Sequence, residues 1–468
     1  MAEQFDLVII GSGNAGYHPA IRASQLGMSV ALVEKESYLG GTCLNWGCIP
    51  TKAFLQSALM LNNLKHHGEQ FGIVADGVEF DFSKANEHKN QVVGQLQKGV
   101  QGLMKKNKIQ VFTGTGSFVE AKKIKVEGED GEQELEAENV LIATGSGVKS
   151  LPGMEFDGEK IISSDDVVSS DSYPSSVIIF GAGAVGVEFA SMYNDFGTDV
   201  TVVEMLDRIV PLEDPEISEA LKKEFENRDI RVLTSTQADP ESLEKTDDGV
   251  KMEVETEDGE ETVEAEAILV AVGRRTVTED LNLDEIGIEL NDDGTIPADE
   301  YGRTSVDGVY AAGDVIGGYW LAHAASHEGI VAVEHMAGEN PLPMDQTLVP
   351  RVTFCRPEVA SFGLSKAEAE EEGYEVKEAK FPFQAIGKAL IEGEPNGFVK
   401  VVADEETDLL LGMHAIGPHV TDLIAEGVFA KLVEGTPQEM GMAIHAHPSL
   451  SEVMGEAAMA VDGNAIHI

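Results

Sequence analysis

The chain has 468 residues and carries 33 basic against 83 acidic side chains, for a formal net charge of −50. A chain this acidic repels nucleic-acid phosphates and anionic lipid surfaces, which argues against a nucleic-acid or membrane-surface role. There is no apolar run of about 18 residues and no signal-peptide pattern at the start, so we expect a cytoplasmic protein of about three to four domains.

The first predicted element is a strand, FDLVII at residues 5–10, and the glycine spacing GxGxxG follows it at Gly11, Gly13 and Gly16. Strand, tight turn and helix in this order let the backbone approach a pyrophosphate at the N-terminus of the helix. The next strand, VALVE, ends in Glu34, whose carboxylate can accept hydrogen bonds from ribose hydroxyls. This spacing predicts a dinucleotide site.

Cys43 and Cys48 lie in the next segment, GTCLNWGCIPTK at residues 41–52. A loop this short can close into a reducible disulfide, whereas a stapled secreted domain would need more cysteines in fewer residues. The third cysteine, Cys355, is far along the chain, and the further ligands of a tetrahedral zinc site are not evident near the pair. Redox chemistry without a metal is therefore the predicted role of Cys43 and Cys48.

Two stretches outside the motifs predict ordinary structure. A helix is expected over residues 90–106 as part of the core, because apolar side chains recur there near the helical period. They are Val92, Val93, Leu96, Val100, Leu103 and Met104. The acidic, strand-rich stretch KMEVETEDGEETVEAEAILVAVG is expected to present its charges on a solvated face.

The nucleotide pattern recurs at residues 176–204, where a second apolar strand precedes Gly181, Gly183 and Gly186 and the next strand ends in Glu204. The chain therefore carries two predicted dinucleotide sites. A glutamate at the strand end suits a free ribose 2′-hydroxyl and repels a 2′-phosphate, which favours NAD over NADP. Arg208 lies four residues further on and leaves a phosphate contact open.

Two later strand ends and one C-terminal motif complete the candidates. ENVLIATGS at 138–146 and TSVDGVYAAGDV at 304–315 each end a strand in a glycine turn, and the second offers Asp314 to a polyol. In HAHPSLSE, His447 is followed by Glu452, and dithiol oxidation needs a base together with a carboxylate that holds its ring. Helix capping is the alternative interpretation of that motif. His445 is the weaker candidate base, because it lacks a correspondingly placed acid.

Together, GTCLNWGCIPTK, the paired glycine motifs, ATGS, YAAGD and HAHPSLSE resemble the dihydrolipoamide dehydrogenases, a family within the class I pyridine nucleotide-disulfide oxidoreductases, over essentially the whole chain. The resemblance implies that the first site holds FAD and the second NAD. The implied FAD contacts, beside the first glycine motif, are Glu34, Thr42, Lys52, Gly116, Thr144, Gly145, Ser146, Asp314, Leu321, Ala322 and His323. The implied NAD contacts are Gly181, Gly183, Gly186, Glu188, Glu204 and Gly273.

The resemblance also implies a role for each reactive group. Cys43 exchanges with the substrate dithiol, Cys48 faces the flavin, and His447, held by Glu452, takes the proton. Lys52 sits by the reactive flavin edge and pairs with Glu188, and a lysine ammonium near a cysteine lowers the thiol pKa from its free value of about 8.5. The implied activity is NAD-dependent oxidation of protein-bound dihydrolipoamide.

The expected fold class is α/β, with two Rossmann-type dinucleotide-binding domains and an α+β C-terminal dimerisation domain. The predicted boundaries are 1–145 for FAD binding, 146–272 for NAD binding, 273–345 for a central domain that completes the FAD site, and 346–468 for the interface domain. The resemblance implies a homodimer whose base comes from the other subunit, and a lipoyl-bearing carrier domain of a 2-oxoacid dehydrogenase or glycine cleavage complex as its partner.

Three alternatives stay open at this point. A glutathione-type reductase would be expected to carry arginines for NADPH near Glu204. A mercuric reductase would be expected to carry a C-terminal cysteine pair, and no cysteine follows Cys355. A non-catalytic flavoprotein subunit would be expected to lack the cysteines or the histidine.

Three features depart from the expected pattern. Pro19 falls inside the first predicted helix and allows a bend or a delayed helix start. Trp46 replaces a small apolar residue between the cysteines, and LAHAASHEG differs from the family after His323. The acidic excess suggests a salt-adapted, halophilic source, because salt screens such charges.

Overall fold

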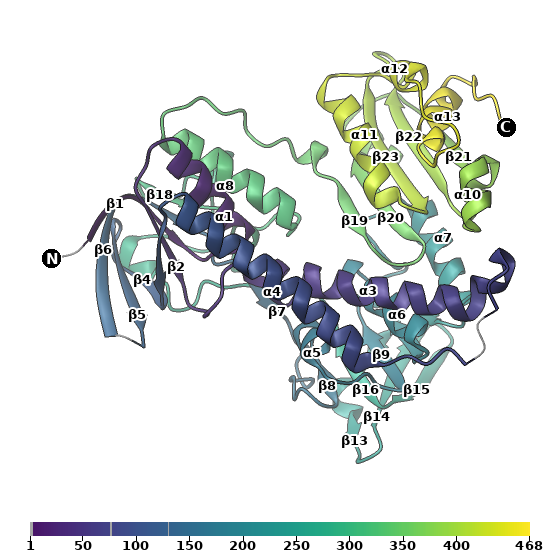
Figure 1. The fold of residues 1–468 in the computed structure, drawn as a ribbon, viewed down its shortest axis with the longest axis horizontal. Coiled ribbons are helices and arrows are strands. Elements are labelled where there is room, and N and C mark those ends of the chain that lie inside the picture. The colour runs from purple at the N-terminus through teal and green to yellow at the C-terminus, as the bar shows by residue number, and fades with distance from the viewer. Residues whose placement is uncertain (1–2, 75–76, 130) are drawn as a thin grey trace. The chain divides into compact units, whose positions relative to one another are not determined.

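The computed structural model describes residues 3–74, 77–129 and 131–468. They form two units, each assembled from three stretches of the chain. The first unit comprises residues 1–54, 81–149 and 274–344, and the second comprises residues 55–80, 150–273 and 345–468. Figure 1 shows the elements of both.

The first unit is built on one mixed sheet in the order β3-β2-β1-β6-β5-β4, with β18 paired to β6. The pairs β1–β2, β1–β6, β2–β3 and β18–β6 are parallel, while β4–β5 and β5–β6 are antiparallel. The strands are β1 (Glu3–Ile10), β2 (Val30–Glu34), β3 (Gln110–Thr113), β4 (Thr115–Glu120), β5 (Lys123–Gly128), β6 (Gly131–Ile142) and β18 (Val309–Ala311). A separate two-stranded antiparallel sheet is formed by β7 (Ser146–Val148), which follows β6 in the chain, and β17 (Arg274–Thr276).

The helices of the first unit are α1 (Asn14–Gln25), α2 (Gly41–Asn45), the start of α3 (Cys48–Asn62), α4 (Phe82–Lys106) and α8 (Ala322–Met336). The first helix begins directly after the glycine turn, so the delayed start that Pro19 allowed is wrong. Pro19 is buried within α1, and a Cβ atom on Gly329 of α8 would lie only 2.8 Å from its Cγ. The proline ring therefore fills space that a side chain at Gly329 would otherwise need.

The helix predicted over 90–106 is confirmed and begins earlier, at Phe82, where the Asp81 side chain accepts hydrogen bonds from the backbone of Ser83 and Lys84. The expectation that its whole apolar stripe is core is only partly right. Val100 and Met104 are buried, whereas Leu96 and Leu103 are 40% and 39% exposed.

The second unit contains a parallel sheet in the order β11-β10-β9-β16-β8. Its strands are β8 (Ile161–Ile162), β9 (Ser176–Phe180), β10 (Asp199–Val203), β11 (Arg231–Leu233) and β16 (Ala267–Val270), and its helices are α5 (Ser164–Ser169), α6 (Ala184–Phe196) and α7 (Pro215–Glu226). All the pairs in this sheet are parallel, as in a doubly wound nucleotide fold.

A small antiparallel sheet follows, with β12 (Gln237–Ala238), β13 (Glu244–Lys245), β14 (Val250–Thr256) and β15 (Gly259–Ala265). In β14, Val250, Met252 and Val254 are buried, while the charged residues between them point to solvent. The expectation of a solvated acidic face is confirmed for this strand.

The C-terminal part of the second unit is an antiparallel sheet in the order β19-β20-β23-β22-β21. Its strands are β19 (Arg351–Thr353), β20 (Glu358–Gly363), β21 (Val376–Pro382), β22 (Phe398–Asp404) and β23 (Leu410–Gly417). The helices are α9 (Lys366–Glu371), α10 (Gly387–Glu392), α11 (Val420–Leu432), α12 (Pro437–Met442) and α13 (Glu452–Val461). Every residue of β23 is buried, so both faces of the sheet centre are covered. The predicted fold class is confirmed.

Among the helices of the described residues, none is both long enough and apolar enough to span a bilayer.

Candidate active site

The first glycine turn has the geometry that close approach of a ligand requires. Gly11 has a φ of +104°, and a Cβ atom there would lie 2.2 Å from the carbonyl oxygen of Ala143. A Cβ on Gly16 would lie 2.0 Å from the carbonyl oxygen of Gly11, so α1 packs tightly on the turn. Gly13, by contrast, has no neighbour nearer than 3.9 Å and forms the N-cap of α1. The backbone is therefore open where a pyrophosphate would approach.

Glu34 holds this turn from the end of β2. Its Oε2 accepts hydrogen bonds from the backbone N–H of Ser12 at 2.9 Å and from the Ser12 hydroxyl at 2.6 Å. Its Oε1 accepts from the backbone N–H of Glu36 at 3.0 Å. Each carboxylate oxygen can accept more than one hydrogen bond, so the buried Glu34 fits a ribose as well.

The second glycine turn repeats this geometry. Gly181 has a φ of +98°, and a Cβ on Gly186 would lie 1.9 Å from the carbonyl oxygen of Gly181. Gly183 has nothing within 4 Å and forms the N-cap of α6. At the strand end, Glu204 Oε2 accepts from the backbone N–H of Ala182 at 2.6 Å. The internal repeat predicted from the sequence is thus also a repeat of contacts.

The segment that carries the cysteines packs on the first turn. A Cβ on Gly41 would lie 2.6 Å from the Cα atom of Gly13, and the backbone N–H of Gly40 donates to the carbonyl oxygen of Ser12 at 3.1 Å. Burial and then the nearby Cys43 sulfur raise the pKa of Tyr17 on α1. Cys43 therefore lies close to the first helix of the dinucleotide fold.

Cys43 lies on α2 and Cys48 begins α3, and both are free thiols in the structure. A hydrogen bond with Cys48 and burial raise the pKa of the Cys43 thiol, and the positive charge of Lys52 opposes this shift. The expectation that Lys52 lowers the thiol pKa is right in direction for its own charge. The net shift of the Cys43 pKa is upward, because the neighbouring sulfur and the loss of solvent outweigh one ammonium group.

Thr42 and Trp46 frame the cysteine pair. The backbone N–H of Trp46 donates to the carbonyl oxygen of Thr42 at 3.0 Å, which ends α2. The ring of Trp46 contacts that of Tyr38 edge to face, with centroids 5.9 Å apart. This aromatic contact accounts for a large side chain between the cysteines.

The third cluster joins the predicted Ser146 and Asp314 to Arg274 and Glu328, two residues that the sequence alone did not single out. Ser146 donates to the Asp314 carboxylate, and Nε of Arg274 donates to the Ser146 hydroxyl at 2.7 Å. Oε2 of Glu328 accepts from the backbone N–H of Gly313 at 2.9 Å, and burial raises the Glu328 pKa. Asp314 is therefore fixed near a second, partly buried carboxyl group.

The remaining predicted cofactor residues lie in loops, at a helix start and, for Gly116, in strand β4. Thr144 Oγ1 donates to the carbonyl oxygen of Val277 at 2.6 Å, and Gly145 follows it with a φ of +72°. Gly116 packs against the side chains of Val33 and Ile10, where a Cβ would lie 3.1 and 3.2 Å from their nearest atoms. Gly273 has a φ of +112°. The run Leu321, Ala322 and His323 forms the N-cap and first turn of α8.

The predicted base is bound to its predicted carboxylate. Nδ1 of His447 lies 2.9 Å from Oε1 of Glu452, and Oε2 of Glu452 accepts from the backbone N–H of Ser449 at 2.9 Å. The Ser449 bond and then His447 lower the Glu452 pKa, so the carboxylate stays ionised. Because α13 begins at Glu452, helix start and histidine partner coincide in one residue.

The reason for ranking His445 second was wrong. Nε2 of His445 lies 2.8 Å from Oε1 of Glu426 on α11, so His445 also has a carboxylate partner. The sequence did not reveal it because Glu426 comes 19 residues earlier, on helix α11, whereas His445 lies in a loop. The His445 side chain is 12% exposed, however, whereas that of His447 is 80% exposed. Of these two histidines, His447 is the one that presents its ring to solvent.

Glu188 lies on α6 and is buried. Its Oε1 accepts from the backbone N–H of Phe354 at 2.8 Å. Lys52 belongs to the first unit and Glu188 to the second, so their pairing stays a prediction. Within the part of the chain that the structure describes, no group of three or more side chains is placed to hold a metal ion.

Comparison with known proteins finds full-length similarity. Residues 5–329 match the pyridine nucleotide-disulphide oxidoreductase family, and residues 349–458 match its dimerisation domain. The chain is 47% identical to dihydrolipoyl dehydrogenase of Bacillus subtilis and 42% identical to that of Zymomonas mobilis, each over 100% of both chains. It is 27% identical to the crystal structure of LpdA from Mycobacterium tuberculosis, with a TM-score of 0.90 over 98% of this chain and 100% of that one.

Proposed function

Because the chain belongs to the pyridine nucleotide-disulphide oxidoreductase family, we propose that it is a dihydrolipoyl dehydrogenase that oxidises protein-bound dihydrolipoamide and reduces NAD. The observation that carries this proposal is the contact between the Cys43 and Cys48 thiols on a segment packed against the first glycine turn. Two sulfurs in contact can close into a disulfide, and that disulfide can exchange with a substrate dithiol.

The first turn is proposed to hold FAD and the second NAD. The open backbone at Gly13 and Gly183 supports both assignments, because a side chain at either glycine would fill the approach of a pyrophosphate. Around the first turn, Asp314 and the N-terminus of α8 offer an acceptor and backbone donors within the same unit. Bound FAD supplies two-electron chemistry between thiols and a nicotinamide.

The reaction is balanced by one disulfide, one hydride and one proton. Dihydrolipoamide loses two S–H bonds and gains an S–S bond, NAD⁺ gains a hydride, and a proton is released. Within the protein, Cys43 is proposed to exchange with the substrate sulfur and Cys48 to lie on the flavin side. His447 takes the thiol proton, and Glu452 holds its ring and stabilises the imidazolium.

The base acts on the substrate thiol, which must lose its proton before its sulfur attacks the disulfide. The hydrogen bond with Cys48 and burial raise the pKa of the Cys43 thiol, so Cys43 takes up a proton when the exchange releases its sulfur. Lys52 favours the thiolate and is proposed to lie by the flavin, paired with Glu188. We further propose a homodimer in which His447 serves the partner's cysteines, and this is supported by the match to the dimerisation domain.

A lipoyl-bearing carrier domain of a 2-oxoacid dehydrogenase or glycine cleavage complex is the proposed protein partner, and the cytoplasm is the proposed location. Purified protein should carry non-covalent FAD. Assays with dihydrolipoamide, glutathione disulfide and both pyridine nucleotides test the function. Turnover of dihydrolipoamide with NAD⁺ is expected, whereas protein that never binds flavin, or that turns over only glutathione disulfide, would contradict the proposal.

A further inference from the structure

One face of the C-terminal sheet carries polar side chains that lie opposite one another on neighbouring strands. Pairing across β19, β20, β23, β22 and β21 aligns Arg351, Ser361, His414, Lys400 and Lys380. We call these five residues the polar row. Only 33 of the 468 residues are Lys or Arg, so three of them on one line concentrate a scarce charge.

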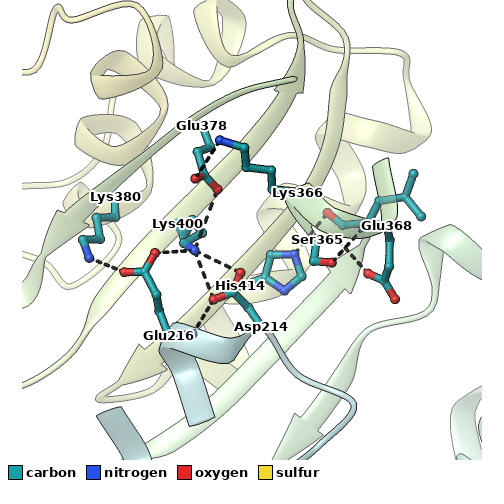
Figure 2. A network of polar contacts seen from close by, with 10 residues as sticks. Asp214, Glu216, Ser365, Lys366, Glu368, Glu378, Lys380, Lys400 and His414 are labelled. Atoms are coloured by element: carbon teal, nitrogen blue, oxygen red, sulfur yellow. Dashed lines mark hydrogen bonds and ion pairs between the residues drawn. The ribbon is translucent and has the colours of Figure 1, made fainter. Parts of the chain in front are cut away.

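Lys400 and Lys380 of the polar row point to carboxylates at the start of α7 (Figure 2). Nζ of Lys400 lies 3.0 and 2.9 Å from the two carboxylate oxygens of Asp214 and 2.7 Å from Oε1 of Glu216. At the other end of the row, Nε of Arg351 lies 3.3 Å from Oε1 of Glu213. The side chains of Lys400 and Asp214 are only 5% and 3% exposed.

The ion pair between Lys400 and Asp214 fixes the position of α7 more than it adds to the stability of the fold. An apolar pair of similar volume often stabilises a fold as well as a buried ion pair does, whereas loss of one partner leaves the other charge without compensation. Two short contacts from one ammonium group to both oxygens of Asp214 also hold α7 in one position on β22. Salt screens such a buried pair much less than an exposed one.

Backbone hydrogen bonds connect this position to the second glycine turn. Asp214 is the N-cap of α7, and the N–H of the preceding Glu213 donates to the carbonyl oxygen of Val210 at 2.9 Å. The N–H of Val210 donates to the carbonyl oxygen of Ala182 at 2.7 Å. Ala182 stands between the two glycines of the turn. The path from Lys400 to the turn thus runs through a few residues that are all in the second unit.

We propose that Lys400 is a positioning residue for the nicotinamide dinucleotide, acting through Asp214 and Val210 on the turn around Ala182. The effect of Lys400 on the glycine turn is indirect. Lys400 holds Asp214, and the segment from Val210 to Asp214 makes the contact with the turn. This inference rests on the proposed function in one respect, namely that the second turn binds NAD. The C-terminal sheet then contributes to nucleotide affinity as well as to dimerisation.

Replacement of the lysine in the FAD-loaded full-length protein tests the proposal. Lys400→Met keeps the aliphatic volume and removes the charge. The Kd for NAD⁺, measured by titration calorimetry, and the KM for NAD⁺ should both rise roughly fivefold or more, the lower bound for coupled sites. Reduction of the enzyme by dihydrolipoamide, followed without NAD⁺, should keep its rate. A merely structural defect would instead lower both half-reactions together.

Lys366→Met is the matched control. Lys366 lies 3.5 Å from Oε1 of Glu378, a carboxylate that also faces Lys400, but it is 44% exposed and makes no ion pair with α7. An exposed ion pair of this kind contributes little to stability. The Kd of the Lys366→Met variant for NAD⁺ should therefore stay within about twofold of the parent value.

Two further variants keep the test decisive if Lys400→Met does not fold. Asp214→Asn retains an acceptor for the cap and should weaken NAD⁺ binding by a smaller factor. The double variant Lys400→Met/Asp214→Asn removes both buried charges and should recover stability but not affinity. Parent-like NAD⁺ binding in Asp214→Asn and in the double variant would overturn the role of Lys400 but leave the proposed function standing. A parent protein that binds FAD but no NAD⁺ would overturn the proposed function together with it.

Discussion

Nδ1 of His447 lies 2.9 Å from Oε1 of Glu452, while the second oxygen of that carboxylate is bound to the backbone of the same loop. Glu452 therefore holds the ring through Nδ1. The His447 side chain is 80% exposed, which leaves Nε2 for an incoming group. This is the arrangement that a proton acceptor for an incoming thiol requires.

His447→Gln should slow the dithiol half-reaction and spare the nucleotide half-reaction. Loss of a positioned general base costs roughly 10²- to 10⁴-fold, while the cysteines, the flavin site and the second turn remain. Stopped-flow reduction by dihydrolipoamide, recorded separately from reduction by NADH, measures the difference. His467→Gln is the control, because His467 forms a similar pair with Glu456 at 2.7 Å, and it should retain both rates. Equal slowing of both half-reactions in His447→Gln would remove the assignment.

The two cysteines should separate by spectroscopy. If Cys48 lies on the flavin side, Cys43→Ser leaves a thiolate that gives a long-wavelength charge-transfer absorbance with oxidised FAD, and Cys48→Ser abolishes that absorbance. Both variants should lose dithiol turnover. Absorbance spectra of the two purified proteins decide the matter, and a band that survives only in Cys48→Ser would exchange the two roles.

Alkylation of Cys43 should depend steeply on pH. A raised thiol pKa means that the thiol is protonated at neutral pH and that the reactive thiolate accumulates only as pH rises above the ordinary value of about 8.5. The rate of iodoacetamide labelling in the reduced protein, assigned to Cys43 by peptide mass spectrometry, should therefore climb through the alkaline range. Lys52→Met should slow labelling at each pH, because the lysine charge lowers the thiol pKa. A plateau reached below about pH 8 would contradict the shift.

Local motifs explain how much of this site the sequence could predict. Glycine turns and the His447–Glu452 pair depend on residues a few positions apart. Their spacing along the chain therefore largely determines how they lie in space. The partner of His445 is 19 residues away, and Lys400 is 186 residues from Asp214. Such contacts are created by tertiary packing, which no local pattern encodes. Pro19 is a related case, because its ring lies against Gly329 of a helix that is distant in sequence, where a Cβ atom would be only 2.8 Å from its Cγ.

Nucleotide choice should follow Glu204. A 2′-phosphate near this buried carboxylate would bring like charges together, so kcat/KM should favour NAD⁺ over NADP⁺ by a wide margin. Glu204→Ser should narrow the margin and also weaken NAD⁺ binding, because the backbone N–H of Ala182 loses its 2.6 Å acceptor. Arg208→Met is the control and should leave the preference unchanged. Comparable efficiency of the two nucleotides with the parent protein would reject this prediction.

Stability should rise with salt, because the chain carries a formal net charge of −50, with 83 acidic against 33 basic side chains. Screening shortens the Debye length from about 10 Å at 0.1 M to about 3 Å at 1 M, which weakens repulsion between exposed carboxylates. The Tm of the FAD-loaded protein should therefore increase over this range of KCl, and NaCl should act alike. Replacing the exposed Glu253 and Glu255 of β14 with Gln should reduce the dependence. A Tm that is flat or falls with salt would show that the acidic surface serves no such adaptation.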